Sequence, residues 1–261
     1  MRLNELFKRD IRSSPFTGNL NQQYEKILDD CSEAFLAFSK NIVVYKGIKN
    51  LDRPIYKTDP RKGLRQSANT SNYYTLLMDN LPVWKDYPKR SRSLICSTNT
   101  FKAGSYGNLY VVLPLNGAKF GVCPSHDIWD TDIEPNFSFD AVNAYYGEQE
   151  LSESSYPEFL RGLVHTRYNF YDSISDLEES HIKHHFATSV NNAATEQEME
   201  KVLSTYYNPQ RLGFKLLPIN EIPSRKTSRE VWTDSPSYLI NTESTFYKKY
   251  IWPRIRIDYA Y

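Results

Sequence analysis

Three short β-strand patterns follow one another in the first half of the chain, and they constrain the fold more than any other feature. The first is the apolar run 93–97, which leads into Ser97-Thr98-Asn99. The other two, 109–114 and 118–123, follow at once, with Asn116-Gly117 between them. This pattern predicts buried strands that deliver a small polar cluster to a cleft.

Strand and helix patterns alternate in blocks along the rest of the chain. An N-terminal segment, 1–40, contains the clearest amphipathic helix, at 22–38. A β-branched run at 42–48 predicts a strand, and the periodicity turns helical between about 139 and 208. Strand patterns return at 213–217, 230–233 and 237–240. The sequence therefore predicts an α+β fold, with a domain at 41–261 that carries a helical insertion.

Composition narrows the classes of function. A hydrophobic content of 40% is sufficient for a core, and 32 basic against 31 acidic residues give a net charge of +1. This balance provides no electrostatic argument for bulk binding to nucleic acid or to a membrane. No apolar stretch approaches the roughly 18 residues of a membrane span, and the first residues lack the apolar core of a secretory signal. Three cysteines cannot form a disulfide framework, so we expect a cytoplasmic protein.

Three short motifs occur in order on the predicted strands: Tyr45-Lys46-Gly47, Ser97-Thr98-Asn99 and Glu230-Val231-Trp232. In this order they resemble the mono-ADP-ribosyltransferases of the Arg–Ser–Glu type. That family carries an Arg-Gly on its first strand, a Ser-Thr-Ser on a later strand and a glutamate that opens a late strand. The resemblance covers roughly residues 42–125 and 213–240. It implies a split β-sheet core and transfer of ADP-ribose from NAD to a protein or nucleic-acid acceptor.

The resemblance also implies a role for each motif. Glu230 would be the catalytic carboxylate, which holds a ribose hydroxyl and stabilises the oxocarbenium-like sugar as nicotinamide leaves. Ser97 would orient that carboxylate, and Thr98 and Asn99 would line the same cleft. Lys46-Gly47 would meet the pyrophosphate or ribose of NAD. However, lysine replaces the arginine of the family here, and an ammonium lacks the two-pronged donor geometry of a guanidinium.

A stretch predicted as a loop, 52–70, offers a substitute for that arginine. Arg65 and Asn69 from this loop would contact the dinucleotide, and Tyr73 or Tyr74 would stack on nicotinamide. The alternative interpretation is a polar loop that closes on a helix with core tyrosines.

The sequence leaves alternatives for the identity of the catalytic glutamate and of the acceptor. Ser228 occupies the position, two before Glu230, where arginine-modifying members carry a second glutamate, so the acceptor is not identified. Glu148-Gln149-Glu150 is a competing Glu-x-Glu motif, although no strand pattern follows it. Alternatively, Glu230 is a strand-edge charge paired with Arg225 or Arg229.

Other patterns suggest functions of a different class. His181, His184 and His185 have a spacing that places two imidazoles on one helix face, but no carboxylate or cysteine completes a ligand set, so no metal site is predicted. Cys123 precedes His126 and is either a nucleophile beside a base or a buried strand-end thiol. The basic and aromatic segment 84–92 is either a single-stranded nucleic-acid surface or a solvated loop.

The chain is thus either an enzyme or a binding protein. The first hypothesis is an NAD-dependent ADP-ribosyltransferase or NAD glycohydrolase, a class also found among secreted effectors and in bacteriophages. By analogy with the latter, the acceptor would be a host macromolecule. The second hypothesis is a catalytically inactive binding or structural protein on a similar α+β fold, favoured by Lys46 and Ser228.

Overall fold

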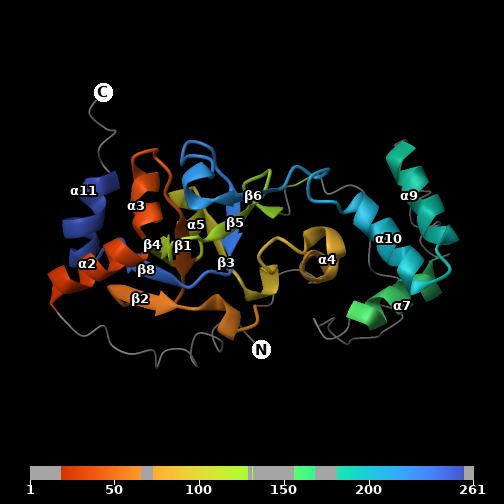
Figure 1. Ribbon diagram of the computed structural model, residues 1–261, viewed down its shortest axis with the longest axis horizontal. Coiled ribbons are helices and arrows are strands. Elements are labelled where there is room, and N and C mark those ends of the chain that lie inside the picture. Colours follow the sequence, from red (N-terminus) through yellow and green to blue (C-terminus); the bar gives the residue numbers. More distant parts are fainter. Residues whose placement is uncertain (1–18, 66–72, 129–130, 132–155, 168–180, 256–261) are drawn as a thin grey trace. The chain divides into compact units, whose positions relative to one another are not determined.

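The computed structural model describes residues 19–65, 73–128, 131, 156–167 and 181–255. The chain divides into two compact units. The first comprises residues 1–68, 87–130 and 214–261, and the second comprises residues 69–86 and 131–213. Figure 1 shows the strands in the first unit and α4, α7, α9 and α10 in the second.

Eight strands of the first unit form one antiparallel sheet in the order β2-β8-β4-β1-β3-β7-β5-β6. The strands are β1 (Tyr45–Ile48), β2 (Ile55–Thr58), β3 (Leu94–Ser97), β4 (Asn108–Pro114), β5 (Lys119–Val122), β6 (Lys215–Pro218), β7 (Glu230–Thr233) and β8 (Ser237–Asn241). The α+β class is confirmed. The loop predicted at 52–70 is wrong at β2, which Pro54 and Pro60 conceal in the sequence. Prolines are tolerated next to β2 because it is an edge strand.

The sheet consists of two four-stranded halves, β2-β8-β4-β1 and β3-β7-β5-β6, that meet at one point. β1 pairs with β4 along its whole length but with β3 only through Tyr45 and Ser97. A continued ladder would place Lys46 opposite Cys96. Instead, Lys46 Nζ donates a hydrogen bond of 2.8 Å to the carbonyl of Ile95. A side chain thus bridges the two halves where the backbone ladder ends.

The connection from β7 to β8 requires the two halves to fold toward each other. Thr233 ends β7 and Ser237 begins β8, so four residue steps of at most about 14 Å join them. In a flat sheet these strands would lie four strand spacings apart, or about 19 Å. The sheet therefore cannot be flat, and its bend lies among the strands between β7 and β8, which include the β1–β3 junction.

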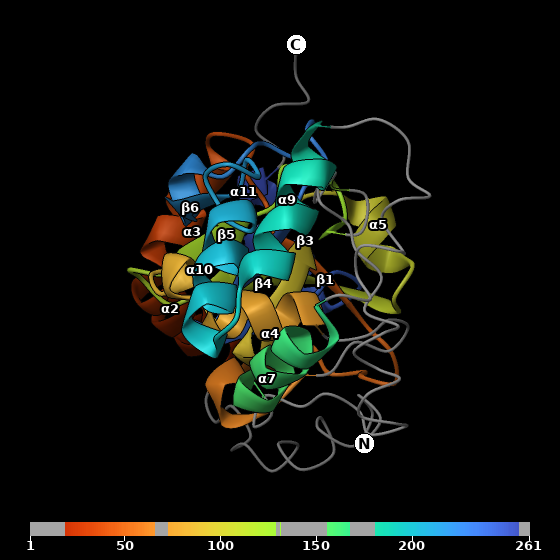
Figure 2. The ribbon, with the colours of Figure 1, turned by 90° about the vertical axis from the view of Figure 1, so that its right-hand side faces the viewer.

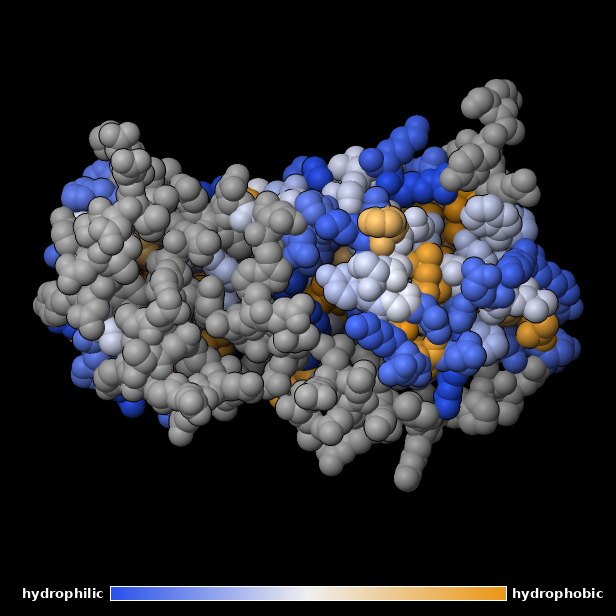
Figure 3. Space-filling view, turned by 180° about the vertical axis from the view of Figure 1, so that it is seen from behind, coloured by the Kyte–Doolittle hydropathy of each residue, from blue (hydrophilic) through white to orange (hydrophobic). Residues whose placement is uncertain are grey.

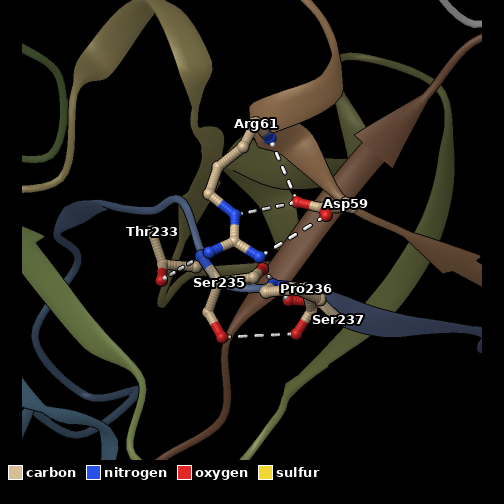
Figure 4. Close-up of polar contacts among 6 residues, drawn as sticks. All are labelled: Asp59, Arg61, Thr233, Ser235, Pro236 and Ser237. Atoms are coloured by element: carbon tan, nitrogen blue, oxygen red, sulfur yellow. Dashed lines mark hydrogen bonds and ion pairs between the residues drawn. The ribbon is translucent and has the colours of Figure 1, made fainter.

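Hydrogen bonds hold this connection in place (Figure 4). Thr233 Oγ1 accepts from the amide of Ser235 at 3.2 Å, and Ser237 Oγ donates to the carbonyl of Ser235 at 2.9 Å. Nearby, after β2, both terminal oxygens of Asp59 accept from the guanidinium of Arg61, at 3.1 and 3.4 Å. The hydrogen bonds of Thr233 and Ser237 stabilise the turn that carries the chain between the two halves.

Helices of the first unit pack beside the sheet. They are α2 (Leu20–Asp30), α3 (Ser32–Phe38), α5 (Thr100–Gly104) and α11 (Trp252–Ile255), with a π-helical turn at Tyr247–Ile251 and short 3-10 turns at Pro60–Lys62, Arg90–Arg92 and Ile219–Glu221. The helix predicted at 22–38 is interrupted at Cys31, whose thiol donates to the carbonyl of Leu113 in β4 at 3.4 Å. The rings of Tyr24 and Tyr250 stack 4.8 Å apart and join α2 to the C-terminal helical segment.

The described part of the second unit is helical (Figure 2). Its helices are α4 (Tyr73–Asn80), α7 (Tyr156–Thr166), α9 (His181–Asn192) and α10 (Glu196–Tyr206), with a 3-10 turn at Pro82–Trp84. The last three α-helices fall in the insertion expected at about 139–208. Phe186 packs edge-on against Tyr206 at 4.8 Å, and Trp84 Nε1 donates to the carbonyl of Tyr207 at 2.8 Å. These aromatic contacts give the second unit its own core.

The described residues form no membrane-spanning helix, and the face shown in Figure 3 has no broad hydrophobic area. Among the described residues, no helix combines the length and the hydrophobicity that crossing a membrane requires. On the face in Figure 3, the described side chains are mainly hydrophilic, and hydrophobic ones are confined to small patches.

Gly121 allows β5 and β7 to pack closely, which gives a test of the fold. Gly121 pairs with Trp232, and a Cβ at this position would lie 2.2 Å from the indole ring. We expect Gly121→Ala to lower the free energy of unfolding by about 2 kcal/mol or more, because Trp232 is fully buried and cannot retreat. Urea denaturation measures this change.

Gly104→Ala is the matched control, since no atom lies within 4 Å of a Cβ added there. It should leave the stability unchanged or raise it by up to about 1 kcal/mol. Equal effects of the two substitutions would contradict the close packing at Gly121.

Candidate functional site

The sheet brings three motifs from distant parts of the sequence together. β3 lies between β1 and β7, and Ser97 pairs with Tyr45 on one side and with Glu230 on the other. Directly paired residues of antiparallel strands project to the same face, so Ser97 and Glu230 are neighbours. Lys46 follows Tyr45, so its side chain leaves β1 on the opposite face, but its ammonium still lies within electrostatic range of Glu230. The site therefore lies where the two halves of the sheet meet.

Thr98 fixes the backbone that leads into β7. Its amide donates to the carbonyl of Arg229 at 3.0 Å, and its hydroxyl accepts from the amide of Arg229 at 2.9 Å. The same hydroxyl donates to the carbonyl of Thr227 at 2.7 Å. Thr98 is fully buried, so these bonds hold residues 227–229 firmly and define where Glu230 begins its strand.

Ser97, Asn99 and Gly47 all make contacts that organise α5. Ser97 Oγ accepts from the amide of Asn99 at 3.0 Å. Asn99 caps α5, because its side-chain oxygen accepts from the amide of Lys102 at 3.1 Å. A Cβ on Gly47 would lie 1.9 Å from the carbonyl oxygen of Ala103, so α5 can approach β1 only at a glycine. These local contacts account for Asn99 and Gly47 without a ligand.

Glu230 forms a buried ion pair with Arg90. Arg90 Nη1 lies 2.6 Å from Glu230 Oε1, and the two side chains retain only 5% and 11% of their exposure. The guanidinium carbon of Arg90 lies 5.5 Å from the centre of the Trp232 ring. Among the described residues, no group donates a hydrogen bond to Glu230 Oε2. One carboxylate oxygen is therefore fixed, and the other is available to a ligand.

Sequence reasoning did not identify Arg90 as a site residue. It lies in a basic and aromatic stretch whose composition is typical of a solvated loop, and its spacing from Glu230 carries no signal. Only the placement of the Arg90–Arg92 turn beside β7 makes the pair apparent. The alternative partners considered for Glu230, Arg225 and Arg229, do not form this ion pair.

Two further cations lie within electrostatic range of Glu230. Burial lowers the pKa of Lys46, and Arg65 lowers it further, whereas Cys96 and Glu230 oppose the shift. Burial also lowers the pKa of Arg65 to about 10, and Arg90 acts in the same direction. Glu230 attracts both cations. The site therefore concentrates positive charge around one carboxylate.

Arg65 differs from Lys46 and Arg90 in that its side chain makes no hydrogen bond among the described residues. Among the described residues, no hydrogen bond engages its guanidinium, whereas its backbone amide donates to the carbonyl of Ser91 at 2.6 Å. Tyr106 and Asp127 are also within electrostatic range of it. Partial desolvation raises the pKa of Tyr106, and the charges of Asp127 and Glu230 raise it further. Arg65 thus presents unused donors within electrostatic range of Glu230.

The remaining predicted residues contribute less. Asn69, Glu148 and Glu150 lie outside the described residues. Tyr73 begins α4 in the other unit, and its side chain is not described. Ser228 Oγ is buried and has no hydrogen-bond partner among the described residues.

The structure does not favour the nucleic-acid surface or the cysteine nucleophile, and it gives no support for a metal site among the described residues. The nucleic-acid surface at 84–92 loses support, because Trp84 and Tyr87, the aromatic side chains that would stack on bases, are buried. Cys123 is fully buried, which agrees with a strand-end thiol rather than an exposed nucleophile. Among the described residues, no three His, Cys, Asp or Glu side chains converge as metal ligands.

No protein-family model matches the chain, and searches of curated proteins and of solved structures find no significant match. The assignment of the site therefore rests on the geometry of this chain.

The buried cysteines give a test of the site's surroundings. Burial raises the pKa of Cys31 and of Cys96 to about 12 in each case, with Asp30 adding to the shift at Cys31 and Glu230 at Cys96. Cys123 has no exposed surface. At about pH 8, we therefore expect all three thiols to resist an aromatic disulfide reagent in the native protein and to react after denaturation. A thiol that reacted rapidly in the native protein would contradict this packing.

Proposed function

We propose that the chain is an NAD-dependent mono-ADP-ribosyltransferase, with hydrolysis of NAD as the reaction when water is the acceptor. The observation that carries the proposal is the arrangement of Lys46, Ser97 and Glu230 on three adjacent strands, β1, β3 and β7. The resemblance inferred from the sequence assigns these positions to one site, although they are far apart in the chain. Their juxtaposition at the meeting point of two half-sheets supports that assignment.

Glu230 supplies the central chemical function. Its free oxygen, Oε2, accepts a hydrogen bond from a hydroxyl of the nicotinamide ribose and stabilises positive charge that develops at C1′. The bond between C1′ and the nicotinamide nitrogen breaks, and its electron pair leaves with neutral nicotinamide. The acceptor nucleophile then forms a bond to C1′ and releases its proton to water. No strong acid is required, because the nicotinamide ring of NAD is a pyridinium cation that becomes neutral as it leaves.

Arg65 supplies the contact to the pyrophosphate. Lys46 donates to the carbonyl of Ile95, and Arg90 pairs with Glu230, whereas the guanidinium of Arg65 has no hydrogen-bonded partner among the described residues. A guanidinium binds phosphate oxygens with two parallel hydrogen bonds. Arg65 therefore takes over the task that the family's first-strand arginine performs.

A specific observation also favours a second candidate function, an inactive dinucleotide- or anion-binding protein. Glu230 Oε1 is already occupied by Arg90, which reduces the charge that the carboxylate can offer a cationic transition state. Such a protein would bind NAD through Arg65 without cleaving it. The two functions differ in turnover and not in NAD binding.

Release of nicotinamide from NAD distinguishes them. We expect the wild-type protein to release nicotinamide, and Glu230→Gln to slow release by about 100-fold or more, because the amide cannot stabilise the charged sugar. Glu230→Asp keeps the negative charge but moves it away from the ribose, because the side chain is shorter. Its rate of nicotinamide release should fall between those of the wild type and Glu230→Gln. Rates are compared at a temperature well below the unfolding midpoint of each variant.

Glu221→Gln is the matched control, since Glu221 is an exposed glutamate of the same unit. Its rate should equal that of the wild type. Thermal stabilisation by millimolar NAD without nicotinamide release would support the inactive binding protein. Absence of both release and stabilisation would contradict the proposed function and its alternative together.

Arg65 has a kinetic signature of its own. Arg65→Gln should raise the KM for NAD by roughly 10- to 100-fold with a smaller effect on kcat, because a charged hydrogen bond to phosphate contributes about 1.5–3 kcal/mol. Arg61→Gln removes an arginine that is paired with Asp59 instead and should leave KM unchanged. An unchanged KM in Arg65→Gln would show that Arg65 does not bind the pyrophosphate.

A further inference from the structure

We propose that Arg90 is the positioning residue for Glu230, an inference that rests on the proposed function. It holds Oε1 so that Oε2 is presented to the ribose. Arg90 Nη1 lies 2.6 Å from Glu230 Oε1, and both side chains are almost completely buried. A glutamate side chain has several rotatable bonds, so an unrestrained carboxylate would sample many positions. Fixing one oxygen removes most of that freedom.

Ser97, to which the resemblance assigns the orienting role, is engaged elsewhere. Its hydroxyl oxygen accepts from the amide of Asn99, at the start of α5. Among the described residues, Ser97 makes no hydrogen bond to Glu230, although the two residues pair directly across β3 and β7. Arg90 makes the contact to the carboxylate instead.

Arg90 is itself held by rigid neighbours. Its guanidinium lies over the indole of Trp232, whose Nε1 donates to the carbonyl of Pro88 at 2.9 Å. Trp232 in turn packs on Gly121. Ser91, the next residue, accepts a hydrogen bond from the amide of Arg65. The arginine is therefore fixed by β7 and by the segment that carries the cation assigned to the pyrophosphate.

Stability alone does not explain this ion pair. Burying two opposite charges costs several kcal/mol of desolvation for each, and well-packed apolar residues of similar volume are often as stable or more stable. A carboxylate that is fixed through one oxygen, with the other oxygen unpaired among the described residues, suits a reaction that develops positive charge beside it.

Kinetics of Arg90 variants test the inference. Arg90→Lys keeps the positive charge but cannot hold Oε1 in the same place, so kcat for nicotinamide release should fall about 10- to 100-fold while KM for NAD stays within about twofold. Arg92→Lys, at an exposed arginine two residues away, is the matched control and should show wild-type kinetics.

A second measurement covers the case in which Arg90→Lys folds poorly. Arg90→Ala leaves a space for a guanidinium ion, and added guanidinium at low millimolar concentration should restore kcat severalfold without acting on the wild type. Restoration supports a role of the guanidinium in the reaction, because a purely structural defect would not respond in this way.

Three results would overturn the inference. Wild-type kcat in Arg90→Lys would show that the carboxylate needs no such anchor, and a rise in KM alone would make Arg90 a binding residue. Failure of guanidinium to restore a folded Arg90→Ala would count against it as well. A wild-type protein without turnover would contradict the proposed function itself, which distinguishes that failure from a failure of the Arg90 inference.

Discussion

One backbone pair, Tyr45 with Ser97, joins the two halves of the sheet, and the candidate site depends on it. Had β1 and β3 paired along their length, the backbone would satisfy Ile95, and the ammonium of Lys46 would be directed elsewhere. The short connection from β7 to β8 prevents a flat sheet, so the strands between them must bend. Sharp bending is compatible with a ladder that is one pair long. The topology therefore opens the sheet where β1, β3 and β7 lie side by side.

The opening of the sheet at this point gathers buried charges of both signs, whose interactions depend on one another. Lys46, Arg65 and Arg90 all lie within electrostatic range of Glu230, and burial lowers the pKa of Lys46 and Arg65. Glu230 is a counter-charge to all three cations, and Asp127 is a second one to Arg65. Removing charge from any one of them changes the environment of the others, because interactions in a desolvated site are weakly screened. The cluster behaves as a unit, with a surplus of positive charge that suits an anionic ligand.

The sequence predicts the strands well because their signals are local. Alternating or β-branched runs mark β1, β3, β4, β5, β7 and β8, and a turn dipeptide marks the connection from β4 to β5, although these two strands pair with other neighbours. β2 was missed because its flanking prolines indicate a loop, although prolines are tolerated beside an edge strand. The break at Cys31 was missed because the helical spacing of apolar residues continues through it. The partner of Glu230 was also missed, since 140 residues separate it from Arg90 and no local pattern encodes such a contact.

The ion pair of Glu230 bears on whether the site is catalytic or only binds an anion. A carboxylate that pairs through both oxygens has fewer acceptor positions left for a substrate hydroxyl, whereas the ion pair of Glu230 with Arg90 uses Oε1 alone. Its neighbour Arg65 has donors that no described residue uses. A binding protein needs the free arginine but gains nothing from a half-free buried carboxylate, which repels the phosphates beside it. Retaining both groups is consistent with a reaction that must hold an anion and stabilise a cation within the same site.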